Sequence, residues 1–174
     1  MFQGWENFYY LMGSAAAGLI GLMFVAISLT RNSDPDKAER GQRLFMTPTV
    51  MQLAITLTIA GVALAPKLTP EAHRWIMGAI AGWGLIYTAP SAFRLGSDKD
   101  ASAHWSDFWF YGAGPVSIYL LLEIAIADWA LPHDLSCNLM ALSLLALLML
   151  SIRNAWDLVT WMAPRRGGPP ETLH

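Results

Sequence analysis

The stretch Gly13–Ser28, GSAAAGLIGLMFVAIS, is the centre of an apolar run over residues 8–30 that carries no charged side chain. At a rise of 1.5 Å per residue, about 20 apolar residues cross the hydrocarbon core of a bilayer. Gly13, Ala17 and Gly21 follow one another at intervals of four, so they share one helix face. In lipid, such faces let two helix backbones approach closely. The stretch therefore predicts a transmembrane helix that packs at the centre of a bundle.

The composition of the whole chain is that of a membrane protein rather than of a soluble domain. Of its 174 residues, 55% are hydrophobic and 14% are charged, and the mean hydropathy is +0.39. A soluble domain carries about a quarter charged residues. The charges here lie in short segments between long apolar runs, which is typical of multi-pass membrane proteins. With a net charge of −2 and no basic patch, we expect no nucleic-acid partner.

Four further apolar runs follow the first, so we predict an all-α fold, a polytopic transmembrane helix bundle of about five spans. No basic residue precedes the first run, so we expect this helix to be retained rather than cleaved as a signal. Gly112, Gly114 and Pro115 are expected to break or bend the fourth helix. A single bundle covers residues 1–163, and the Pro- and Gly-rich tail 164–174 is expected to be disordered. The predicted spans are about 8–30, 47–66, 75–95, 108–131 and 135–162.

The basic residues are unevenly divided between the two ends of such a bundle. With five spans, the first loop, the third loop and the tail lie on one side, and the second loop lies on the other. The second-loop side holds two basic residues, Lys67 and Arg74. The opposite side holds eight: Arg31, Lys37, Arg40, Arg43, Arg94, Lys99, Arg165 and Arg166. The positive-inside rule therefore predicts a periplasmic N-terminus and a cytoplasmic C-terminus.

Two glycines of the third span are candidates for helix packing. Gly78 and Gly82 form a Gly-xxx-Gly pair, which offers a second small face. We predict that this pair receives the small face of the first helix. An alternative is that the first helix uses its small face for an oligomer contact.

The second span carries a stripe of polar residues on one helix face. Thr49, Gln52 and Thr56 lie three and four residues apart. The stripe is a candidate lining for an ion or solute path. The alternative is that these side chains hydrogen-bond to a neighbouring helix or to their own backbone.

The acidic residue Glu123 lies deep within the fourth span, in the segment LLLEIAI. The predicted topology places it in the outer part of the membrane, where Arg74 or His73 is the reachable cation. Arg153 is expected near the opposite face, where it pairs with Asp157 at i,i+4. Carboxylates inside membranes are costly, so they face a cavity, a partner or a bundle interior. Glu123 is therefore either a hydrogen-bonded structural group or a cation- or proton-binding site.

The remaining residues offer little for catalysis or metal binding. The single cysteine, Cys137, permits no internal disulfide and no cysteine metal cluster. The four histidines fall in loops, at helix ends or in the tail, and no nucleophile and base come together. We therefore predict no metal, no cofactor and no enzymatic activity.

The opening pattern FYYLMGSAAAGLIGLMFVAISL at 8–29, followed by a charged loop and FMTPTV at 45–50, resembles a family of small uncharacterised multi-pass bacterial inner-membrane proteins. The resemblance covers the first 50 or so residues. It implies a bacterial inner-membrane location and no particular activity.

Two functions fit these features. One is a small oligomeric channel or transporter for an ion or small solute, suggested by Glu123 and the polar stripe. The alternative is an accessory or assembly subunit that packs against a larger membrane complex, suggested by the many small and aromatic residues. In both, the lipid bilayer and other protein subunits are the partners.

Overall fold

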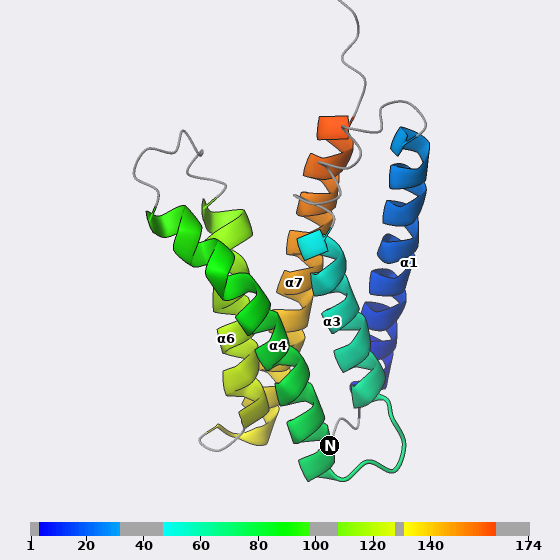
Figure 1. Ribbon diagram of the computed structural model, residues 1–174. Coiled ribbons are helices and arrows are strands. Elements are labelled where there is room, and N and C mark those ends of the chain that lie inside the picture. Colours follow the sequence, from blue (N-terminus) through cyan, green and yellow to red (C-terminus); the bar gives the residue numbers. More distant parts are fainter. Residues whose placement is uncertain (1–3, 32–46, 98–107, 128–130, 163–174) are drawn as a thin grey trace, which may run out of the picture.

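The computed structural model describes residues 4–31, 47–97, 108–127 and 131–162, and within these ranges the chain is all-helical (Figure 1). The tail 164–174 lies outside the described residues, as do most of the basic residues on which the orientation depends. The helices are α1 Glu6–Arg31, α3 Thr47–Ala63, α4 Pro70–Ser97, the π-helix η2 Phe108–Ala113, α6 Gly114–Ala127 and α7 His133–Met162.

The helices alternate in direction along the chain (Figure 1). The start of α1, the connection from α3 to α4 and the start of α7 lie at one end of the molecule. The ends of α1, α4 and α7 lie at the other end, together with the start of α3. Because η2 continues directly into α6, these two elements make one pass between the ends. The result is an up-and-down arrangement in which α1, α4 and α7 run one way and α3 and α6 run the other.

Local sequence explains where α4 begins. The Thr69 hydroxyl accepts a hydrogen bond from the backbone N–H of Ala72 at 3.2 Å, which caps the first turn. Pro70 occupies the first helical position, where its missing N–H costs nothing, and Glu71 follows in the first turn. The helix therefore starts at Pro70, earlier than the predicted span, and carries Arg74 and Trp75 within it.

A π-helix precedes α6 at the site where the sequence predicts a break. Pro115 has no backbone N–H to donate to the carbonyl four residues earlier, and its ring crowds that carbonyl. The six residues Phe108–Ala113 adopt the wider π-helix, and the regular helix begins at Gly114. The chain therefore changes its winding at the Gly-and-Pro segment instead of stopping there.

The partner of the first helix differs from the expected one. α1 packs against α3 and α7. A Cβ atom built on Gly13 would lie 3.4 Å from the Ala60 Cβ atom of α3, whereas one on Gly21 meets nothing within 4 Å among the described residues. Ala17 is also exposed. The predicted pairing of this face with Gly78 and Gly82 is therefore wrong, because the neighbouring helix α3 supplies its own small residue at Ala60 and covers only one end of the face.

Two of the described helices have the length and apolar composition that a membrane span requires. Within α1, Glu6–Leu29 is long and apolar enough to cross a membrane, and so is His133–Asp157 within α7. The apolar segments Pro48–Ala63 of α3 and Gly114–Ala127 of α6 are shorter.

The tightest contact of α4 lies at Gly84. A Cβ atom there would lie 2.5 Å from Tyr119 Cε1 of α6 and 2.8 Å from Ile55 Cδ1 of α3. Tyr119 is fully buried, so its ring cannot simply swing out into solvent to make room. The absence of a side chain at Gly84 thus lets three helices meet.

We predict that Gly84→Ala lowers the free energy of unfolding by about 1–3 kcal/mol, because it overpacks this contact. The measurement is the thermal unfolding midpoint of the purified protein in detergent. Gly61→Ala is the matched control, since a Cβ atom there meets nothing within 4 Å among the described residues. It should be neutral, or stabilising by up to about 1 kcal/mol through helix propensity. Equal midpoints for the two variants would contradict the packing at Gly84.

Candidate functional site

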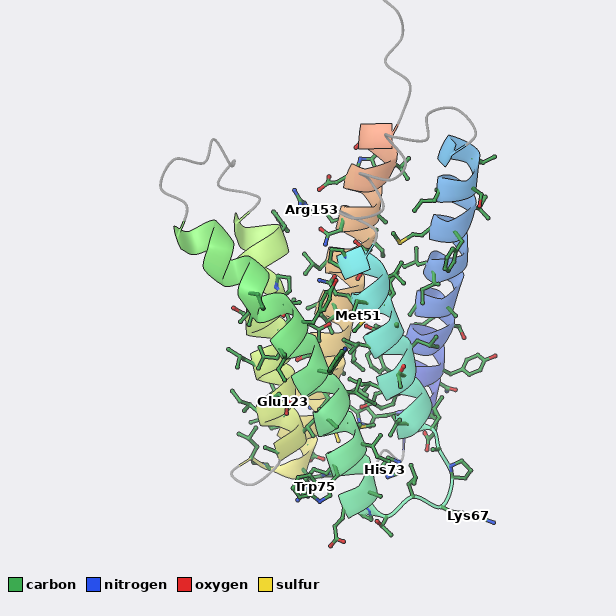
Figure 2. The ribbon with its side chains drawn as sticks, in the orientation of Figure 1. Met51, Lys67, His73, Trp75, Glu123 and Arg153 are labelled. Carbon is green, nitrogen blue, oxygen red and sulfur yellow. The ribbon has the colours of Figure 1, made fainter. Side chains whose placement is uncertain are left out.

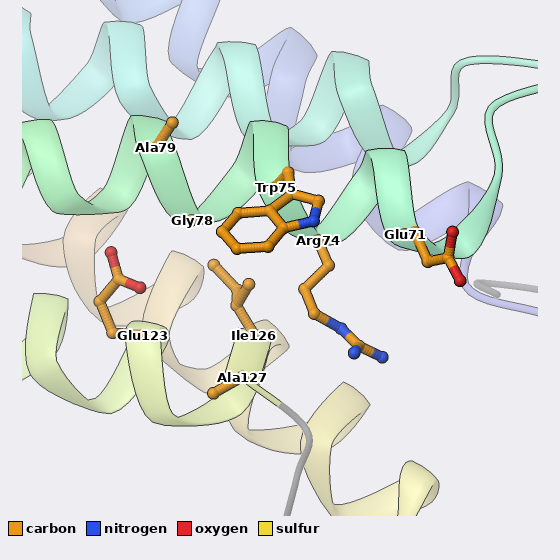
Figure 3. Close-up of a pocket in the computed structure, with 8 residues that line it drawn as sticks. All are labelled: Glu71, Arg74, Trp75, Gly78, Ala79, Glu123, Ile126 and Ala127. Carbon is orange, nitrogen blue, oxygen red and sulfur yellow. The ribbon is translucent and has the colours of Figure 1, made fainter.

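A pocket of about 440 Å³ lies between α4 and α6 (Figure 3). α4 contributes one wall and the last two turns of α6 contribute the other. Most of its lining is apolar, and its charged groups are two carboxylates and one guanidinium. The lining residues are Glu71, Arg74, Trp75, Gly78, Ala79, Glu123, Ile126 and Ala127.

The carboxylate of Glu123 rests against the Gly-xxx-Gly pair of α4. A Cβ atom on Gly82 would lie 3.2 Å from Glu123 Oε1, and one on Gly78 would lie 3.8 Å from Oε2. Glu123 is partly buried, and within the described part of the chain its carboxylate makes no hydrogen bond or ion pair. The two glycines thus leave a space that is occupied by a carboxylate rather than by a second helix backbone.

Arg74 shares this pocket with Glu123, as the sequence-based topology anticipates. The two side chains lie at opposite ends of the pocket in Figure 3, with Trp75 and Ile126 between them in this view. Ile126 is buried, whereas the Trp75 side chain is 77% exposed. The pocket therefore has a negative end, an apolar middle and a second end where Arg74 and Glu71 lie.

Trp75 is not among the site residues predicted from the sequence. The same is true of four other lining residues: Glu71, Ala79, Ile126 and Ala127. The sequence suggests only an aromatic residue at the start of a span. Trp75, Gly78, Ala79 and Gly82 are spaced at i, i+3, i+4 and i+7, which is the spacing of one helix face. Since this face contains the Gly-xxx-Gly pair, the spacing could have linked Trp75 to the same site.

Arg153 lies far along the bundle from Glu123 (Figure 2). Its guanidinium pairs with Asp157, with Nη1 3.4 Å from Oδ2, as their i,i+4 spacing predicts. The same guanidinium carbon lies 3.4 Å from the ring centroid of Phe110, a cation–π contact that joins α7 to η2. Arg153 therefore stabilises the opposite end of the bundle and takes no part in the Glu123 pocket.

The polar stripe of α3 is buried, and it does not line the Glu123 pocket. Thr49, Gln52 and Thr56 are each at most 2% exposed. The Thr56 hydroxyl donates to the Gln52 carbonyl at 3.0 Å. The Ser151 hydroxyl of α7 lies within hydrogen-bonding distance of Gln52 Oε1, at 3.2 Å, and of the Leu147 carbonyl, at 2.8 Å, and its single hydrogen is shared between these two acceptors. Of the two interpretations, this geometry matches hydrogen bonding to the helix itself and to a neighbouring helix.

The described residues contain one thiol close to a histidine. Cys137 is buried, and its Sγ atom lies 3.7 Å from His133 Nε2 one turn away on α7. The structure thus brings a thiol and an imidazole together, which was not expected from the sequence. No group of three or more His, Cys, Asp or Glu side chains among the described residues is placed to hold a metal ion. His104 and His174 lie outside the described residues.

Comparisons of the chain with protein-family models, with curated proteins and with solved structures found no match. The resemblance of residues 8–50 to bacterial inner-membrane proteins therefore stays a prediction. The geometry of the Glu123 pocket is then the main guide to function.

Proposed function

We propose that the protein is a multi-pass membrane protein of five spans that forms a small channel or transporter, in which Glu123 binds a cation or a proton on its path. The proposed location is a bacterial inner membrane, with the N-terminus in the periplasm and the C-terminus in the cytoplasm. We further propose that the working form is a homo-oligomer.

The exposed apolar surface supports the membrane part of the proposal. On α1, the side chains of Leu11, Leu22 and Leu29 are each more than 60% exposed. α7 likewise exposes Leu142 and Met149 to more than half of their surface. Large exposed apolar faces on long helices are unfavourable in water and favourable in lipid.

The observation that carries the functional proposal is the carboxylate of Glu123 in a pocket with apolar walls. An ionisable side chain in a membrane is costly to keep, and such groups commonly mark ion or proton pathways. Glu123 makes no hydrogen bond or ion pair with the described residues, so its carboxylate is available to a ligand. The pocket also lies near the end of α6, which is where the proposed topology places the outer membrane surface.

We expect reporter fusions to report a five-span topology. A fusion after His174 should report the cytoplasm, and one inserted at Lys67 should report the periplasm. The alternating helix directions put Lys67 and the end of α7 on opposite sides if every helix crosses the bilayer. Paired alkaline phosphatase and fluorescent-protein reporters at both sites provide the measurement. The same compartment at both sites would contradict the five-span topology.

We predict that Glu123→Gln lowers flux about tenfold or more, since a lost charge contact of about 1.4 kcal/mol already corresponds to a factor of ten. The substitution keeps the shape of the side chain and removes its charge. The measurement is flux of protons, potassium and tetramethylammonium into liposomes that contain the purified protein. Glu6→Gln, at the exposed start of α1, is the matched control. Unchanged flux in the Glu123 variant would make this residue structural and would favour the accessory subunit.

An accessory or assembly subunit is the second candidate, and a groove between α1 and α3 favours it. The groove measures about 260 Å³ and is lined by small residues that include Gly13, Ser14, Ala17 and Gly61. Small residues on an open helix surface suit close packing by another membrane helix. On this alternative, a stoichiometric larger partner should co-purify with the protein from the membrane.

Gly21→Leu tests whether the rest of the α1 face is a protein contact. A Cβ atom on Gly21 meets nothing within 4 Å among the described residues, so the fold of the single chain should tolerate leucine. If another subunit packs there, overpacking should cost about 1–3 kcal/mol and reduce assembly. The oligomeric mass in detergent is the measurement, and Thr58→Leu, at an exposed position of α3, is the control. Wild-type assembly in the Gly21 variant would mean that this face contacts lipid.

A further inference from the structure

We propose that the Glu123 pocket binds a hydrophobic organic cation, with its positive head at Glu123 and its apolar body along Trp75 and Ile126. This inference rests on the proposed function, because it takes the Glu123 pocket as the binding site of the path. It adds the chemical class of the ligand and the direction in which the ligand lies.

The negative end of the pocket accommodates a positive head. Glu123 approaches within 3.2 Å of the position of a Cβ atom on Gly82, so the carboxylate lies directly against the α4 backbone. Because Gly78 and Gly82 have no side chains, neither residue screens this carboxylate from the pocket. A positive group placed there gains a charge contact in a poorly solvated environment, where such contacts are stronger than in water.

The walls favour an organic cation over an inorganic one. Hard metal cations take six or more oxygen ligands, or several waters with a few carboxylates. The carboxylates of this pocket are those of Glu123 and Glu71, and Figure 3 shows them at its two ends. Between them lie the Trp75 ring, Ile126 and alanine methyl groups, with the Arg74 guanidinium toward the Glu71 end. Such walls solvate a hydrocarbon or aromatic body and leave a bare ion without ligands.

Size and charge then fix the direction of the ligand. The volume of about 440 Å³ lies in the range of small-molecule sites, about 300–1,000 Å³, which is far more than one inorganic ion requires. Arg74 lies toward the end away from Glu123, on the same side of the pocket as Glu71, so its guanidinium offsets that carboxylate and leaves Glu123 as the better place for a positive head. The head is therefore held at Glu123, and the body extends past Trp75, whose ring can also contribute a cation–π contact.

The probe for this inference is tetraphenylphosphonium, and tetraphenylborate is its control of equal shape and opposite charge. Binding to the purified protein in detergent is measured by equilibrium dialysis. We expect saturable binding of the cation and none of the anion. Glu123→Gln should weaken binding of the cation about tenfold or more. Trp75→Leu should weaken it about two- to fivefold, while Trp83→Leu, an exposed tryptophan of the same helix outside the pocket, should leave it unchanged.

The outcomes separate this inference from the proposed function. Equal binding of the two probes, or cation binding that survives Glu123→Gln in a variant with a wild-type unfolding midpoint, would overturn the ligand class. Flux of protons or small cations that depends on Glu123, without any binding of tetraphenylphosphonium, would also overturn the ligand class. It would still support the proposed ion path through Glu123. Saturable binding that depends on Glu123, in a protein without flux, would support the ligand class and refute the path.

Discussion

The contact between α4 and α6 depends on three glycines of α4 that leave the helix surface bare. Each receives a side chain from one face of α6, where the contacting residues are spaced at i, i+4 and i+7. The pairs are Gly84 with Tyr119, Gly82 with Glu123, and Gly78 with both Glu123 and Ile126. Since lipid gives apolar helices little reason to associate, such close packing contributes much of the stability of a membrane bundle. The same contact positions the carboxylate and one wall of the pocket.

Much of the helical fold could be predicted from the hydropathy of the chain and from the positions of its Gly and Pro residues. The uncharged runs predict where helices lie, the Gly-and-Pro segment at 112–115 predicts where one of them changes, and the described chain is helical over most of each predicted span. The pairing of helices was not predictable in the same way. Gly13 and Gly82 each mark a small face, but smallness does not specify whether a backbone, a methyl group or a carboxylate fills the space. Gly13 meets Ala60, whereas Gly82 meets Glu123.

The site could be predicted in part for a related reason. Glu123 was recognisable because a lone acid in an apolar segment is costly, and Arg74 followed from the topology. Trp75 was not recognised as a site residue, because an aromatic residue at the start of a span is usually explained as an interfacial group. Gln52 is the opposite case, a polar residue whose role the sequence alone leaves open. Its sequence position allows a path or a cross-link, and only the Ser151 hydroxyl at 3.2 Å distinguishes them.

Of the two helices that line the pocket, α6 is apolar along its length and α4 is not. α1 and α7 contain the segments long and apolar enough to cross a membrane, and neither lines the Glu123 pocket. α4 is longer than α1, but it begins with Glu71, His73 and Arg74, and its glycines add no apolar surface. Each charged group that a site places on a helix lowers the mean hydropathy of that helix and is costly in lipid. α4 can remain in the bundle because α3 and α6 pack on it, so α6 both holds α4 in place and supplies the carboxylate that faces it.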